Sequence, residues 1–106
     1  MDTDAGGTWR GIRIAPRREN QQALLELDIT AEKRLDYIYK LEVRDACQLL
    51  ESDYPEEAAS GRRLWVFGIK VKKKPVYVKI QFGKHNEEAL CISFHKARYP
   101  LQFLVN

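Results

Sequence analysis

Three segments in the second half of the chain alternate apolar and polar residues with a period of two, which is the pattern of half-buried β-strands. They span residues 64–71, 76–82 and 89–95. The basic turn KKKP joins the first two strands, and a turn containing Gly83 and Asn86 joins the last two. Strands joined by turns this short pair in antiparallel fashion, so the pattern predicts a three-stranded meander.

The rest of the chain predicts an α+β domain. Residues 9–15 alternate as a short strand that ends at Pro16, and residues 20–27 and 31–41 have apolar positions at helical spacing. Thr30 offers a side-chain oxygen as the N-cap of the second helix, whose buried stripe is predicted to include Tyr39. Residues 43–61 have no clean period and are predicted as a loop that holds a short extended piece over 43–50.

The chain has 106 residues, enough for one core. We expect a disordered segment over residues 1–8 and a single domain over residues 9–106. Two helices are expected to pack on an antiparallel sheet whose last three strands form the meander. The apolar tail, residues 98–106, is expected to lie extended against the core.

Alternation also sorts the side chains of the meander onto two faces. The face expected under the helices carries the apolar sets of the three strands, with Leu90, Ile92 and Phe94 contributed by the last one. The opposite face is expected to show Lys70, Tyr77, Lys79, Gln81, Ser93 and His95. Gly68 is expected to leave room there for a ligand backbone.

Charge is distributed unevenly along the chain. Residues 61–84 contain eight basic residues and no acid: Arg62, Arg63, Lys70, Lys72, Lys73, Lys74, Lys79 and Lys84. Residues 42–57 contain six acids against Arg44 alone. This separation is consistent with a surface for a polyanion and an acidic opposite side. It is equally consistent with a solvated strand edge that lysines keep soluble.

A basic sheet face with aromatic residues and a histidine could cleave RNA as well as bind it. RNA is cut when its own 2′-hydroxyl attacks the adjacent phosphorus, which requires a base, an acid and stabilisation of the phosphate charge. The imidazole of His95 could act as acid or base, Tyr77 could donate a proton or a hydrogen bond, and Lys79 and Lys70 could neutralise phosphate.

Each of these residues also has a purely structural explanation. A histidine at a strand end is commonly a solvated or hydrogen-bonded structural residue, and a strand tyrosine commonly packs on the sheet. Trp65 could stack a base if it were exposed, but a tryptophan in a strand more commonly packs in the core. Lys72, Lys73 and Lys74 fit a solvated turn.

Several classes of site have no signature in this sequence. Cys47 and Cys91 lie far apart, and neither has a partner at metal-ligand spacing, so no metal or cofactor is expected. No apolar run reaches the ~20 residues of a membrane helix, and no signal peptide is evident. We therefore expect two free thiols, a cytoplasmic location and no membrane partner.

Four segments resemble a group of short bacterial proteins assigned to the MqsR-type toxins of toxin–antitoxin systems. They are QALLELDIT (22–30), LWVFG (64–68), VYVKI (76–80) and CISFHKARYPL (91–101). The resemblance covers residues 12–103. It implies a RelE-like α+β fold, metal-independent and sequence-selective cleavage of messenger RNA, and a cognate antitoxin as partner.

The resemblance also implies four active-site positions. The family's strand tyrosine is matched by Tyr77, and the lysine that follows its SF pair is replaced by His95. The glutamine after the strand tryptophan is replaced by Val66, and an upstream lysine falls near Gln48. Either the site is rebuilt around His95 and Lys79, or the chain is not a nuclease.

Two other functions stay open beside the endoribonuclease. One is a non-catalytic module that binds RNA or an antitoxin, and the other is a protein-interaction domain that uses the acidic segment. The observation that separates them best is whether Tyr77, Lys79 and His95 converge on an open concave surface.

Overall fold

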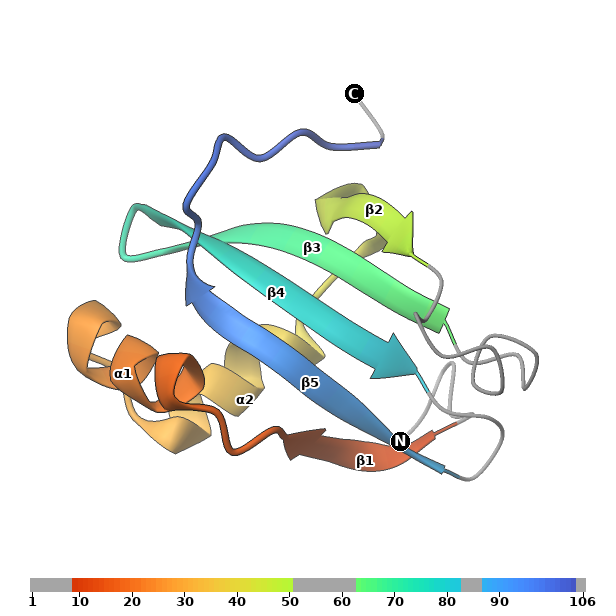
Figure 1. Cartoon of the computed structure of the whole chain (residues 1–106), viewed down its shortest axis with the longest axis horizontal. Helices are drawn as coiled ribbons and strands as arrows, with labels where there is room; N and C mark the ends of the chain where they lie inside the picture. The colour runs from red at the N-terminus through yellow and green to blue at the C-terminus, as the bar shows by residue number, and fades with distance from the viewer. Residues whose placement is uncertain (1–8, 51–62, 83–86, 105–106) are drawn as a thin grey trace.

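A computed structural model describes residues 9–50, 63–82 and 87–104 of the chain (Figure 1). The expected disorder of residues 1–8 lies outside the described residues, as does the part of the predicted loop over residues 51–61. In chain order the elements are β1 (Trp9–Ile14), α1 (Arg18–Leu27), α2 (Ala31–Tyr39), the 3-10 turn η1 (Val43–Asp45), β2 (Ala46–Leu50), β3 (Arg63–Val71), β4 (Lys74–Phe82) and β5 (Glu87–Lys96).

The five strands form one sheet in the order β1-β5-β4-β3-β2. Strands β3, β4 and β5 pair antiparallel and form the predicted meander, and β2 adds antiparallel to β3. The α+β fold with two helices on the sheet is thus confirmed. The sheet is mixed rather than wholly antiparallel because β1 pairs parallel to β5, a partner that alternation within β1 does not specify.

Both helices lie on one face of the sheet, and the chain after β5 crosses toward β2 on the other side (Figure 1). The core forms between the helices and the sheet. Its fully buried side chains come mainly from the centre of the sheet and from α1: Ala23, Leu27, Val71, Val76, Val78, Ile80, Ala89, Cys91 and Phe94. Burying each of the larger aliphatic or aromatic ones stabilises the fold by roughly 1.5–3 kcal/mol.

The start of α2 follows the predicted capping chemistry. The Thr30 hydroxyl oxygen accepts a hydrogen bond from the Lys33 backbone N–H at 3.1 Å, which satisfies one of the free donors of the first turn. The helix ends at Tyr39, before the predicted residue 41. Ile38 is buried, but the Tyr39 side chain is 57% exposed, so its predicted place in the buried stripe is wrong.

A β-bulge in β5 changes which side chains face the core. Lys79 pairs with Ser93, but the next residue, Ile80, pairs with Cys91, so Ile92 is an extra residue in β5. The two ends of β5 are therefore out of phase with each other. Phe94 faces the core on one side of the bulge, and Cys91 and Ala89 face it on the other. The predicted common face of Leu90, Ile92 and Phe94 is wrong because strict alternation does not survive a bulge.

The side chain of Asn20 holds this bulge. Asn20 is fully buried on α1. Its Nδ2 donates to the carbonyl oxygens of Ile92 at 2.9 Å and Ala15 at 3.0 Å, and its Oδ1 accepts from the Phe94 N–H at 2.9 Å. A bulge interrupts the hydrogen bonds of the ladder at this point in β5, and buried backbone groups are costly if left unpaired. One amide thus satisfies both sides of the bulge and also ties it to the end of β1.

We expect Asn20→Ala to lower the free energy of unfolding by about 3 kcal/mol, because it leaves the buried Phe94 N–H without its hydrogen-bond partner and removes two further hydrogen bonds to carbonyl oxygens. Urea unfolding followed by circular dichroism measures this loss. Gln21→Ala is the matched control, since Gln21 is an exposed amide on the same helix. It should change stability by less than about 0.5 kcal/mol. Equal, small losses of stability in both variants would contradict the role of Asn20 in holding the bulge.

The buried thiol next to the bulge has an altered ionisation. Burial raises the pKa of Cys91 from its ordinary value of 9.0 to about 12, while Arg34 and a hydrogen bond with the Ser93 backbone act in the opposite direction. Above the ordinary value the unfolded chain loses this proton and the folded chain keeps it. The unfolded state then binds fewer protons, so stability falls as pH rises from 9.0 toward about 12.

We therefore expect the free energy of unfolding to fall with pH above pH 9.0, with Cys91 contributing up to about 1.4 kcal/mol per pH unit. Denaturant titrations at several alkaline pH values measure the slope. Cys91→Ala should make the slope shallower, whereas Cys47→Ala, which removes a half-buried thiol, should change it less. An unchanged slope in Cys91→Ala would show that this thiol does not carry the effect.

Candidate active-site cleft

An open cleft of about 700 Å³ lies between the sheet and the C-terminal segment, and it is lined by strand residues such as Tyr77 and Lys79 that alternate with the buried, core-facing ones. The sheet contributes Cys47, Gln48, Val66, Tyr77, Lys79, Ser93 and His95 to its lining. The chain before and within α1 contributes Arg17 and Glu19, and the C-terminal segment contributes residues 98–102. Tyr77, Lys79 and His95, the predicted catalytic residues, thus line one concave surface.

Strand pairing explains why these side chains meet. On β4 and β5, Tyr77 is directly opposite His95, and Lys79 is directly opposite Ser93. Directly opposed side chains on one face of an antiparallel pair are close neighbours. The rings of Tyr77 and His95 are stacked, with centroids 5.3 Å apart and planes inclined by 13°. The bulge lies at Ile92, beyond Ser93, so Tyr77 and Lys79 on β4 stay on the same face of the sheet as His95 and Ser93 on β5.

One hydrogen bond assigns the tautomer of His95. Its Nδ1 lies 2.9 Å from the carbonyl oxygen of Lys96. A carbonyl oxygen only accepts, so Nδ1 carries a proton and donates it to this bond. In the neutral ring the proton-free nitrogen is then Nε2. His95 can accept a proton from a ligand at Nε2 without breaking its contact with the backbone.

Tyr77 keeps its proton at neutral pH. The side chain is half-buried, and this burial raises the pKa of the Tyr77 hydroxyl above its ordinary value, with a smaller contribution from Cys47. The pKa of the Cys47 thiol is raised too, first by burial and then by Asp45. Tyr77 therefore presents an O–H donor, and Cys47 a thiol rather than a reactive thiolate.

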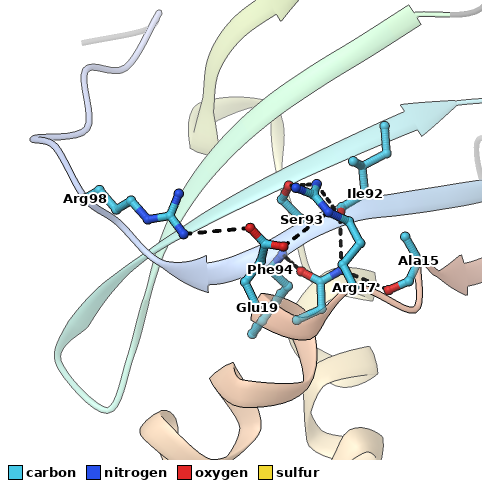
Figure 2. Close-up of polar contacts among 8 residues, drawn as sticks. Ala15, Arg17, Glu19, Ile92, Ser93, Phe94 and Arg98 are labelled. Atoms are coloured by element: carbon cyan, nitrogen blue, oxygen red, sulfur yellow. Dashed lines mark hydrogen bonds and ion pairs between the residues drawn. The ribbon is translucent and has the colours of Figure 1, made fainter.

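Two arginines from outside the strands add positive charge to the cleft, and the sequence analysis missed both. Arg17 Nη1 donates to Ser93 Oγ at 3.1 Å and to the Ile92 carbonyl at 3.3 Å. Arg17 Nε and Arg98 Nη2 lie 3.3 and 3.7 Å from the two carboxylate oxygens of Glu19 (Figure 2). No strand pattern marks these arginines, because one precedes α1 and the other follows β5.

The cleft therefore combines a proton donor, a proton acceptor and an excess of cations. Arg17, Lys79 and Arg98 outnumber Glu19, the only acid among the described residues that line the cleft. Tyr99, which is 81% exposed, adds an aromatic ring at the rim. This composition fits an anionic ligand with flat rings, as a nucleotide strand has.

Gly68 has a different role from the predicted one. A Cβ built on Gly68 would lie 2.7 Å from Leu101 Cδ1 and 3.2 Å from Phe103 Cε1. Side chains of the C-terminal segment thus occupy the space that was expected for a ligand. A hydrogen bond from the Leu104 N–H to the Ala46 carbonyl at 3.0 Å fixes this segment to β2. The segment lies over the open face of the sheet, not against the core beneath the helices.

The predicted RNA-binding residues of the basic run are not gathered around the cleft. Lys72 Nζ donates to the Asp28 carbonyl at 2.6 Å, and Lys74 Nζ donates to the Glu26 carbonyl at 3.3 Å. Both lysines thus bond carbonyl groups at the end of α1, where the helix dipole favours a positive charge. Lys72 and Lys73 form the turn between β3 and β4, with positive φ angles of 51° and 71°.

The remaining predicted residues are dispersed or lie outside the described ranges. Lys70 lines a separate hollow together with Leu101 and Phe103, and Arg63 is exposed at the start of β3. Arg62 and Lys84 lie outside the described residues. Trp65 packs against the core, with its ring centroid 6.4 Å from that of Phe67, so it is not placed to stack a base in the cleft.

The four positions that the toxin resemblance assigns to an active site all line this cleft: Gln48, Val66, Tyr77 and His95. Gln48 and Val66 are paired neighbours on β2 and β3, and Tyr77 and His95 are paired neighbours on β4 and β5. Positions far apart in the sequence thus reach one surface. Only Tyr77 is the residue that the family pattern has, and the other three positions carry different side chains.

Comparison with protein-family models, curated proteins and solved structures finds no match to this chain. The relation to MqsR-type toxins and to the RelE-like fold therefore stays a prediction from sequence motifs. Among the described residues, no cluster of three or more His, Cys, Asp or Glu side chains is arranged to hold a metal ion. In the same part of the chain, no helix has the length and apolar character needed to cross a membrane.

Proposed function

We propose that this protein is a toxin-like, metal-independent endoribonuclease of a bacterial toxin–antitoxin system. The observation that carries the proposal is the convergence of Tyr77, Lys79 and His95 in a cationic cleft, with Tyr77 and His95 at positions that the resemblance assigns to an active site. A cognate antitoxin is the expected protein partner, and messenger RNA in the cytoplasm is the expected substrate.

In the proposed reaction each residue has one step in the cleavage of RNA. His95 Nε2 takes the proton of the 2′-hydroxyl while the 2′-oxygen forms a bond to phosphorus. Tyr77 donates its proton to the leaving 5′-oxygen as the bond from that oxygen to phosphorus breaks. Lys79 neutralises the charge that builds on the non-bridging oxygens. The products are a 2′,3′-cyclic phosphate and a 5′-hydroxyl, and solvent returns the two side chains to their starting protonation states.

A non-catalytic module that binds RNA or an antitoxin is the second candidate. The observation that favours it is the exposed apolar surface of the C-terminal segment beside the cleft, formed by Tyr99, Phe103 and Leu104. A binding surface would use this rim and the same cations without any proton transfer. Cleavage measurements on variants of the two stacked rings separate the two candidates.

If the protein is a nuclease, His95→Ala should slow the cleavage of single-stranded RNA by about 10²–10⁴-fold, because it removes the proton acceptor. Tyr77→Phe should lie between this variant and the wild type, since it keeps the ring and loses the donor. Expression of the wild-type chain should arrest bacterial growth and deplete messenger RNA, and expression of His95→Ala at equal folded protein should not.

Lys73→Ala is the control for loss of a basic side chain away from the cleft. Lys73 is an exposed residue of the β3–β4 turn, so its charge is screened and its removal should alter the rate far less than His95→Ala. If the wild type and His95→Ala are equally harmless and neither cuts RNA, the enzyme proposal fails and the binding module remains.

A further inference from the structure

The ion pairs at the mouth of the cleft have an arrangement that the proposed catalytic step does not use. Each carboxylate oxygen of Glu19 contacts a different guanidinium, Oε1 with Arg17 and Oε2 with Arg98 (Figure 2). The Glu19 carboxylate thus lies between two arginines that come from opposite ends of the chain. Two guanidiniums around a pair of oxygen atoms are also a favourable site for a phosphate group.

We propose that Arg17 and Arg98 form a second phosphate-binding subsite for the RNA strand, which the Glu19 carboxylate occupies in the free protein and leaves when a phosphate binds. This inference rests on the proposed function, because it names how the same cleft holds its substrate. It assigns the subsite to a phosphodiester next to the one at Tyr77 and His95.

Exposure makes such an exchange feasible. The side chains of Arg17 and Arg98 are 43% and 64% exposed, and that of Glu19 is 32% exposed. Ion pairs at this level of exposure contribute little to folding stability, so a phosphate can replace the carboxylate at small cost. Arg17 would stay in place meanwhile, because its Nη1 is held by Ser93 and by the Ile92 carbonyl.

The position of the subsite suits a strand that continues past the catalytic residues. A second hollow of about 500 Å³ adjoins the cleft and shares Glu19, His95 and Arg98 with it. Glu19 therefore lies at the junction of the two hollows. The helix dipole accounts for an acid in the first turn of α1, but it does not account for two guanidiniums that converge on that acid.

The test is the affinity for a fully 2′-O-methylated single-stranded RNA decamer, which binds without being cleaved because it has no free 2′-hydroxyl. Fluorescence anisotropy with the full chain gives the dissociation constant. We expect Glu19→Gln to bind this decamer about 3- to 10-fold more tightly than the wild type, since the competing carboxylate is gone. Thermal melting checks that each variant is folded.

Two further variants separate displacement from a general gain of positive charge. Glu88→Gln makes the same change of net charge at an exposed acid that pairs with Arg13 on β1, away from the cleft, and it should leave the affinity nearly unchanged. In an Arg98→Ala background, Glu19→Gln should lose most of its effect, because the subsite is incomplete. The loss of affinity caused by Arg98→Ala should be smaller in the wild-type chain, where Glu19 already occupies the subsite, than in the Glu19→Gln chain.

Three outcomes would overturn the inference: no gain in affinity from Glu19→Gln, an equal gain from Glu88→Gln, or a gain that persists in full without Arg98. Failure of the wild type and Glu19→Gln to bind the decamer at all would also overturn it. Because the decamer cannot be cut, these results do not depend on catalysis. A gain that requires Arg98, in a protein that never cleaves RNA, would support the subsite and reject the nuclease.

Discussion

The buried amide of Asn20 is the interaction on which the arrangement of the cleft depends. It pairs the backbone on both sides of the bulge in β5 and so fixes where that strand changes phase. On one side of the bulge, Cys91 completes the core. On the other, Phe94 faces the core while Ser93 and His95 face the cleft. The same strand can therefore supply side chains to both the hydrophobic core and the candidate catalytic surface. Asn20 on α1 holds the strand at the point where it changes from one to the other.

Most of the fold could be predicted from the sequence because it follows from local rules. Alternation predicted β3, β4 and β5, and the capping chemistry of Thr30 predicted the start of α2. The bulge could not be predicted in this way, since it depends on a hydrogen-bonding side chain more than seventy residues away in the sequence. The parallel pairing of β1 with β5 also depends on tertiary contacts, and the residue pattern within β1 does not indicate it.

The candidate site was predictable only where strand register decides the neighbours. Tyr77, Lys79 and His95 share one face because of that register, which spans two antiparallel strands. The basic side chains of the cleft were harder to predict, because basic residues that are adjacent in the sequence need not lie at the same place in the fold. Lys72 and Lys74, at the β3–β4 turn, bond carbonyls at the end of α1. Arg17 and Arg98, which lie in no basic run, reach the cleft instead.

The central claim is that RNA binds in the cleft on the open face of the sheet and not along the basic turn. The most direct test is a titration of the isotope-labelled full chain with the 2′-O-methylated decamer, followed by amide chemical shifts in NMR. We expect the largest shift changes at Lys79, Ser93 and His95 and at the chain around Arg17 and Arg98. Largest changes at residues 72–74, with the cleft unaffected, would contradict the claim.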